Sequence, residues 1–139
     1  MKTKNKTILT LAALLVALPA AAGEEVRRSL PTGDAPDVRI ISPTGDIVGM
    51  GESTTNVEIV AELANSKQRL EVSERGNEVL IEISKSGGWQ KDHGTDLVVT
   101  VPRAASVVVE AASADINVEG VRGTLRVATA SGDVDVETF

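Results

Sequence analysis

The sequence contains no cysteine and no tyrosine, and tryptophan, phenylalanine and histidine occur once each in 139 residues. Without cysteine the chain can form no disulfide bond, so its fold depends on hydrophobic burial and backbone pairing. With one histidine and no Gly-x-Ser-x-Gly motif, neither a histidine-rich zinc site nor a serine nucleophile system can be assembled. The composition therefore argues against an enzyme and against a bound cofactor.

Aromatic residues are only 1% of the sequence, so valine and isoleucine supply most of the large apolar side chains. Thin, regular β layers lined by β-branched side chains fit this composition. No segment beyond residue 22 sustains a period of 3.6 residues with capping residues at its ends. We therefore expect an all-β fold with almost no helix outside the N-terminal segment.

The N-terminal segment, residues 1–22, has the layout of a secretory signal peptide. Three lysines are followed by an apolar run from Ile8 to Leu18 and by three alanines that end at Ala22. This run is shorter than the ~20 residues of a membrane span, and no cysteine follows it for a lipid anchor. The mature chain, residues 23–139, is expected to be an exported single domain, periplasmic or at the bacterial cell surface, with no membrane span.

Basic residues are scarce once this segment is removed, because 11 remain against 20 acidic residues, a net charge of −9. Nucleic acid and anionic lipid both need a basic footprint, so neither is an expected partner. An envelope protein or a glycan remains as a partner class, and edge-to-edge self-association remains open.

A repeat near the end of the chain carries most of the architectural information. The segments 107–118 and 125–136 share one pattern, in which an apolar pair is followed by Ser-Ala/Gly-Asp and a second apolar pair, 18 residues apart. The apolar pairs recur every nine residues, and the two members of each pair face one side of a strand. A third copy lies at 38–47 with Thr44-Gly45-Asp46 at its turn. Repeats of this size predict a stacked β architecture, a β-solenoid or β-roll.

The repeat leaves two arrangements open. In a parallel solenoid residues 18 apart stack, so Ile116 lies over Val134, whereas in an antiparallel meander neighbouring nine-residue strands pair as hairpins. Ala114 replaces the glycine that Gly45 and Gly132 supply, which matters only if that position needs a positive φ.

Four further strands are predicted between the first and the later copies by their alternation and β-branched content. They cover residues 57–62, 70–72, 79–83 and 97–101, with turn signals at 65–67, 74–77 and 86–88. Pro102 is expected to end the last of them, because proline cannot donate to a ladder.

With these motifs in place, the chain resembles the bacterial putative-adhesin family, exported β-strand-repeat envelope proteins of unknown function. The resemblance covers residues 25–139 and implies a stacked β-solenoid or roll with adhesive or scaffolding work and no catalytic residues. It depends on four motifs. They are an early Gly-Asp-Ile turn at Gly45–Ile47, a Leu-x-Val and Val-Leu-Ile-x-Ile hairpin within Leu70–Ile83, a Val-Thr-Val-Pro strand end at Val99–Pro102 and the Ser-Gly-Asp-Val-x-Val repeat at Ser131–Val136.

Trp89 is the candidate contact residue for a ligand or partner. It lies with His93 on a glycine-rich loop, where an aromatic ring can stack on a sugar or on a partner surface. The alternative is that Trp89 folds back and plugs one end of the β core. His93 beside Asp92 is interpreted as a surface histidine.

The repeat aspartates allow two interpretations. If consecutive units stack, Asp115, Asn117 and Glu119 lie beside Asp133, Asp135 and Glu137, an oxygen-rich ladder that could attract Ca²⁺. The glycine run of calcium-binding nonapeptide repeats is missing, so a solvated acidic face that keeps the sheet soluble is favoured, and no metal ligand is assigned.

The sequence thus predicts a non-enzymatic exported β-repeat module, an adhesin or envelope scaffold. The alternative is a carbohydrate-active β-helix enzyme that uses Asp133 and Asp135 with Arg122 and Arg126 near them in sequence. Because Phe139 ends the sequence inside a repeat unit, we also expect the parent protein to continue with further repeats.

Overall fold

The computed structural model describes residues 24–64, 67–85 and 94–137, and these residues form strands, turns and no helix. The predicted all-β class is therefore confirmed for this part of the chain. The ten strands are β1 (Glu24–Pro31), β2 (Asp37–Ile41), β3 (Thr44–Glu52), β4 (Asn56–Leu63), β5 (Gln68–Arg75), β6 (Glu78–Lys85), β7 (Asp96–Pro102), β8 (Ser106–Glu119), β9 (Leu125–Ser131) and β10 (Val134–Glu137).

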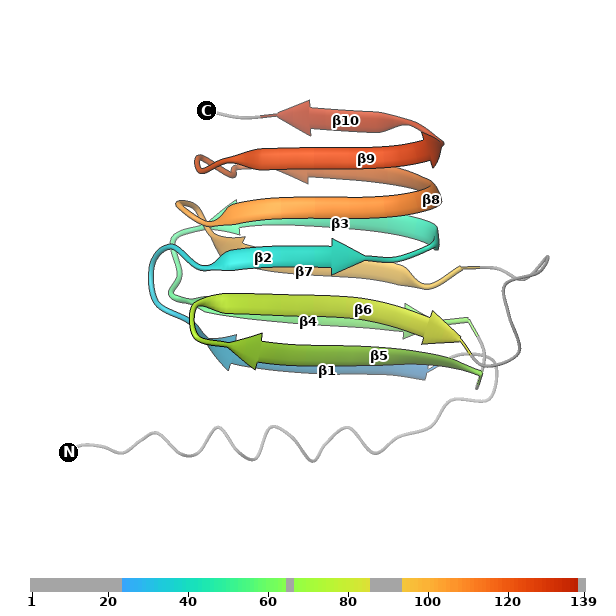
Figure 1. The fold of residues 1–139 in the computed structure, drawn as a ribbon, viewed down its shortest axis with the longest axis horizontal. Coiled ribbons are helices and arrows are strands. Elements are labelled where there is room, and N and C mark those ends of the chain that lie inside the picture. Colours follow the sequence, from blue (N-terminus) through green and yellow to red (C-terminus); the bar gives the residue numbers. More distant parts are fainter. Residues whose placement is uncertain (1–23, 65–66, 86–93, 138–139) are drawn as a thin grey trace.

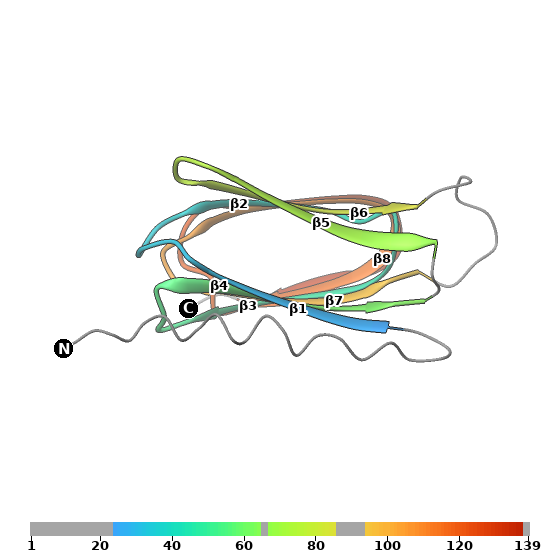
Figure 2. The same ribbon diagram turned by 90° about the horizontal axis from the view of Figure 1, so that it is seen from below.

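All ten strands belong to one sheet that folds back on itself into two layers (Figure 1). The first layer has the order β5-β6-β2-β8-β9, and the second has the order β1-β4-β7-β3-β8-β10. The strand β8 belongs to both layers, because its first half pairs with β2 and its second half with β3. Seen along the stack, the two layers enclose a flattened, nearly closed barrel-like shape (Figure 2).

The three copies of the repeat stack on one another in parallel and in register. Val38 pairs with Val107 and Val107 with Leu125, while Ile47 pairs with Ile116 and Ile116 with Val134. Residues 18 apart therefore lie on adjacent strands in the last two copies, and the antiparallel meander is wrong for this region. The first copy lies directly beside the second, although β4 to β7 separate them in the sequence.

The four strands predicted in the middle of the chain are confirmed as β4, β5, β6 and β7, with β5 and β6 joined by a two-residue turn at Gly76-Asn77. Pro102 is the last residue of β7, as its missing N–H predicts. These strands extend the two layers away from the repeats. The order of the stack therefore differs from the order of the sequence, because β5 and β6 extend the first layer, and β4 and β7 the second, on the side opposite β9 and β10.

The core is a double row of side chains from the two layers. Alternate residues of each strand point inward, since the strand period is two, and most of them are valine, isoleucine or leucine. Burying one such side chain contributes about 1.5–3 kcal/mol. The most completely buried large side chains are Ile40, Ile47, Ile59, Ile81, Ile83, Leu97, Ile116, Val38, Val57, Val99, Val101 and Val109.

The middle position of the repeat turn differs in conformation between the copies. Gly45 and Gly132 have φ values of 106° and 124°; Gly45 is the second residue of β3, and Gly132 lies in the gap between β9 and β10. No described residue other than glycine has a positive φ, so Ala114 keeps an ordinary strand conformation. The strand β8 runs without interruption for 14 residues through both layers.

Some predictions fall on residues outside the described part of the chain. These are the signal peptide at 1–22, the candidate contact residue Trp89 with its neighbour His93, and the chain end at Phe139. Within the described residues, no helix has the length and hydropathy that crossing a membrane requires.

Candidate functional site

Six acidic residues from successive strands form a continuous row on the outer face of the second layer. Their register follows from the strand pairs, and each one is exposed. In spatial order the row consists of Glu25, Glu62, Asp96, Asp46, Asp115 and Asp133, and we call it the acidic column. Because neighbouring strands lie about 4.8 Å apart, the column places one carboxylate at each step along the whole stack.

Two carboxylates of the acidic column fix the repeat turns. The backbone N–H of Asp46 donates to Oδ1 of Asp96 at 3.2 Å, and the backbone N–H of Asp133 donates to Oδ1 of Asp115 at 3.0 Å. In each pair the carboxylate holds the backbone of the next strand along the stack. The aspartates are therefore part of the turn structure, as the sequence pattern indicates.

The oxygen-rich ladder expected from the last two copies is assembled. Asn117 pairs with Asp135, and Glu119 pairs with Glu137, on adjacent parallel strands. Within the described residues, however, no three His, Cys, Asp or Glu side chains are grouped to hold a metal ion. Side chains on one face of a sheet project alongside one another, whereas Ca²⁺ needs six to eight oxygens that converge on one point.

The residues considered for glycoside hydrolysis are separated by the fold. Arg126 lies on the outer side of β9 in the first layer, and Asp133 and Asp135 lie with the outer side of β10 in the second layer. Arg126 therefore faces away from both carboxylates. Asp133 and Asp135 do share one outer face, but Asp133 continues a row of acids instead of bordering a groove.

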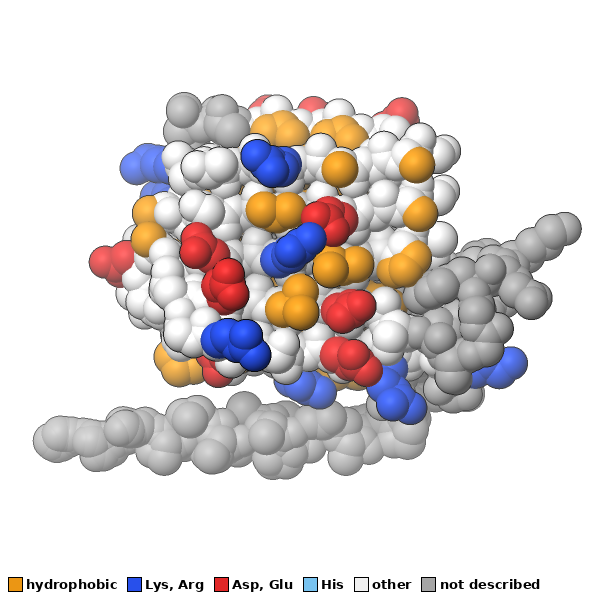
Figure 3. Space-filling view, viewed as in Figure 1, with side chains coloured by type: hydrophobic (Ala, Val, Ile, Leu, Met, Phe, Trp, Pro, Cys, Tyr) orange, Lys and Arg blue, Asp and Glu red, His pale blue; other side chains and the backbone are white. Residues whose placement is uncertain are grey.

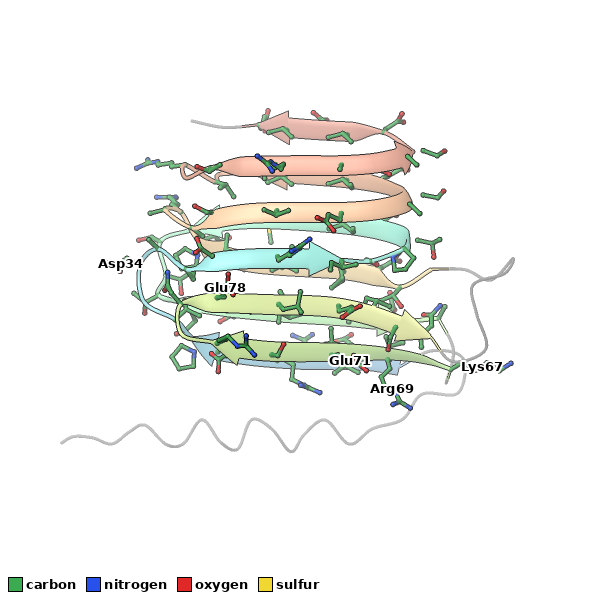
Figure 4. All side chains as sticks on the ribbon, viewed as in Figure 1. Asp34, Lys67, Arg69, Glu71 and Glu78 are labelled. Atoms are coloured by element: carbon green, nitrogen blue, oxygen red, sulfur yellow. The ribbon has the colours of Figure 1, made fainter. Side chains whose placement is uncertain are left out.

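The outer face of the first layer has mixed charge. Arg39 on β2 forms an ion pair with Glu110 on β8 at 2.8 Å, and this face carries both acidic and basic side chains (Figure 3). On the β5-β6 hairpin, Glu71, Glu78 and Arg69 are labelled on the same side of the molecule (Figure 4). The two outer faces thus differ, since only the second layer carries an unbroken acidic row.

The structure contains a buried polar cluster that the sequence pattern did not reveal. The side chain of Gln68 is 3% exposed, and its Oε1 accepts hydrogen bonds from the Ala64 N–H at 2.8 Å and from the Thr95 hydroxyl. Thr95 itself is completely buried. The sequence does contain a signal for it. Gln68 lies two residues before Leu70 and four before Val72, so the strand period of two points all three side chains inward. This cluster joins β4, β5 and the approach to β7.

The two ends of the stack are unlike each other. At one end, β9 and β10 each pair only with β8 among the described strands. Val134 and Val136 on β10 are 46% and 41% exposed, whereas their partners Ile116 and Val118 are 1% exposed. At the other end, β1 and β5 each carry a charged residue at an inward position, Arg28 opposite Ile59 and Glu74 opposite Val79.

Comparison with known proteins gives the fold a context. No protein-family model matches the chain, and no curated protein matches it either. Among solved structures, a putative cell adhesion protein from Clostridium sporogenes aligns with a TM-score of 0.64 at 11% identity, over 82% of this chain and 60% of that one. Putative adhesins from Parabacteroides distasonis and Bacteroides fragilis align with TM-scores of 0.42 and 0.44 at 11% and 12% identity.

These two alignments cover 84% and 85% of this chain and 57% and 62% of the adhesins, so the chain spans about three fifths of the length of the structures it matches. The Clostridium protein has the same overall fold at an identity too low to transfer residue roles. The resemblance to bacterial putative adhesins that the repeat motifs predict is thereby confirmed at the level of the fold.

Proposed function

We propose that the protein is a non-enzymatic, exported β-repeat module that works in adhesion or as a scaffold in the bacterial envelope, in the periplasm or at the cell surface. The observation that carries this proposal is the acidic column, a charged surface that crosses six strand positions on one face of a rigid sheet. A long, regular row of like side chains suits recognition of an extended partner. Catalysis needs groups that converge on a reacting atom, and the candidate residues do not converge.

The stacked copies favour a β-solenoid or β-roll description of the architecture. In such a protein each repeat contacts mainly its neighbours, so the surface is extended along the stack and is well suited to binding. The partners that fit this setting are an envelope protein or an envelope glycan. Further repeats in a longer parent protein remain a prediction, as does removal of residues 1–22 on export.

Binding of residues 23–139 to isolated envelope fractions and to purified envelope glycans tests the proposal. We expect saturable binding that weakens when the acidic column is neutralised by Asp46→Asn with Glu62→Gln. These two residues are chosen because neither carboxylate accepts a described hydrogen bond, so the substitutions remove charge without removing a contact of the fold. The matched control is Glu71→Gln with Glu78→Gln, which removes the same charge from the other outer face. The control variant should bind as the unchanged chain does.

Two outcomes would overturn the proposal. One is the absence of binding to every fraction and glycan. The other is the release of reducing ends from acidic polysaccharides, with loss of that activity in Asp133→Ala, which would establish the carbohydrate-active enzyme instead.

A further inference from the structure

A row of valines lies beside the acidic column on the outer face of the second layer. Val60 on β4, Val98 on β7 and Val48 on β3 occupy directly paired positions on three neighbouring strands, and we call them the apolar row. All three point outward, are half-buried and lie outside the buried core cluster, and Met50 widens the apolar surface along β3. No described strand packs over this face (Figure 2). An apolar surface rimmed by polar residues is typical of an interaction site.

Carboxylates border the apolar row on both sides. Each valine has a member of the acidic column two residues away on its own strand. The bordering acids are Glu62, Asp96 and Asp46 of the column on one side, and Glu58 and Glu119 on the other. None of them takes part in an ion pair between described residues. A partner that complements this face therefore carries apolar side chains flanked by lysine or arginine.

The spacing of the apolar row favours a helix over an extended segment. Its three valines span two strand steps of about 4.8 Å each, ~9.6 Å in total. Two turns of an α-helix rise ~10.8 Å, whereas two side-chain repeats of an extended segment advance ~13.6 Å. In addition, β4, β7 and β3 each have a neighbour on both sides, so none of them offers an edge for an added strand. A helix satisfies its own backbone hydrogen bonds and can bind through side chains alone.

A second copy of this chain does not complement the face. A two-fold axis along the strands places the acidic column of one copy over the acidic column of the other. An axis along the apolar row places the column over the row that contains Glu58 and Glu119. Carboxylates oppose carboxylates in both arrangements, which costs binding free energy. Charge therefore favours a different, basic protein.

We propose that the apolar row and the acidic column together bind a cationic amphipathic helix of an envelope protein. The helix lies across β4, β7 and β3, with its apolar side chains on the valines and its lysine or arginine side chains beside Glu62, Asp96 and Asp46. The apolar contact contributes most of the affinity, and the charges set the orientation of the helix. This inference rests on the proposed function and deepens it, because it names the chemistry of the partner.

A designed helix serves as the probe. The peptide is Leu-Lys-Ala-Gln-Leu-Lys-Ala-Leu-Lys-Ala-Gln-Leu-Lys-Ala, labelled with fluorescein, which as a helix has leucines on one face and lysines along one flank of that face. Fluorescence anisotropy measures its binding to residues 23–139. We expect saturable binding with a gain of helical circular dichroism. A peptide of the same composition, shuffled so that its leucines share no face, should bind at least fivefold more weakly.

Matched valine substitutions locate the apolar contact. Val98→Thr and Val108→Thr each change an outward, half-buried valine, the first on the proposed face and the second in the first layer. Threonine keeps the branched shape that suits a strand, so both variants are expected to fold. Val98→Thr should raise the dissociation constant of the peptide at least threefold. Val108→Thr should change it less than twofold.

Matched charge substitutions locate the polar contact. Asp46→Asn with Glu62→Gln removes two carboxylates beside the apolar row and should weaken peptide binding at least fivefold. Glu71→Gln with Glu78→Gln removes the same charge from the other outer face and should change the dissociation constant less than twofold.

Three results would overturn the inference. Equal binding of the shuffled peptide would show that charge alone recognises the probe, without a helix on the apolar row. An equal loss of affinity in Val108→Thr, or in Glu71→Gln with Glu78→Gln, would mean that the peptide binds the protein surface in general. Sedimentation that shows a dimer weakened by Val98→Thr would assign the face to a second copy.

Envelope binding separates this inference from the proposed function. We expect Val98→Thr to weaken envelope binding, and the unlabelled peptide to displace residues 23–139 from the envelope fraction. Envelope binding that survives both would refute this inference alone and leave the proposed function standing. Peptide binding through Val98 without binding to any envelope fraction would overturn the proposed function instead.

Discussion

Single residues at the repeat turns control how closely successive strands approach. A Cβ at Gly45 would lie 2.1 Å from the carbonyl oxygen of Thr95, and one at Gly132 would lie 2.1 Å from the carbonyl oxygen of Ala114. Both glycines also have positive φ values, which L side chains disfavour. Two independent constraints, backbone conformation and space, thus require glycine at these turns, and the carboxylates of Asp96 and Asp115 hold the turn backbone beside them.

Gly45→Ala and Gly33→Ala separate these two constraints. Both glycines have positive φ, 106° and 92°, but nothing lies within 4 Å of a Cβ at Gly33. A positive φ costs a non-glycine residue about 1–3 kcal/mol. We expect Gly33→Ala to lower the free energy of unfolding by about 1 kcal/mol. Gly45→Ala should lower it by more than about 3 kcal/mol, because the backbone must also move. Urea unfolding of both variants measures the difference, and equal losses would show that space at Gly45 is not limiting.

Among the elements, β8 is the one that joins the two layers. It pairs with β2 and β9 through its first half and with β3 and β10 through its second half, so its inward side chains are covered on both sides. The strand β10 presents the same pattern with a neighbour on one side only. Equivalent positions of the repeat therefore contribute differently to stability according to their place in the stack.

Val118→Ala and Val136→Ala measure that difference at two positions that pair directly. Val118 is 1% exposed and Val136 is 41% exposed. Removal of two buried methyl groups costs about 0.8 kcal/mol each plus a cavity term, so Val118→Ala should destabilise by about 2–3 kcal/mol. Val136→Ala should cost less than about 1 kcal/mol. Thermal and urea unfolding give both values, and a large loss at Val136 would mean that the end of the stack is covered in solution.

Strand positions could be predicted because local periodicity encodes them, whereas the parallel stacking of residues 18 apart was one of two arrangements that the repeat left open. The alternation of Val107, Val109, Ile116 and Val118 specifies which side chains face inward whatever the partner strand is. The stacking of the first copy on β8 could not be predicted, because nothing local records which distant strand is the neighbour. The acidic column was missed for the same reason, since three of its six members, Glu25, Glu62 and Asp96, lie outside the repeats.

At the scale of the whole molecule, charge is distributed unevenly between two faces of similar construction. The first layer carries both signs and contains the Arg39–Glu110 ion pair, whereas the second layer carries the acidic column. Like charges on directly opposed strand positions destabilise a sheet. A column of six such positions is therefore a stability cost that the fold carries, as is common where a surface serves binding.

Glu62→Lys tests that cost at the position between Glu25 and Asp96. The substitution replaces two repulsive cross-strand pairs by two attractive ones, so we expect the free energy of unfolding to rise by about 0.5–1 kcal/mol at low ionic strength. At 1 M NaCl, where charges are screened beyond about 3 Å, most of the gain should disappear. Glu71→Lys on the other outer face is the control. Its strand β5 has one neighbour, so Glu71 opposes one acidic residue, Glu82, where Glu62 opposes two, and we expect a smaller gain in the free energy of unfolding. If the column serves binding, Glu62→Lys should weaken envelope binding while it stabilises the fold. Unfolding and envelope binding are measured on the same preparation of the variant. A lower free energy of unfolding, or a rise in both stability and binding, would contradict the prediction.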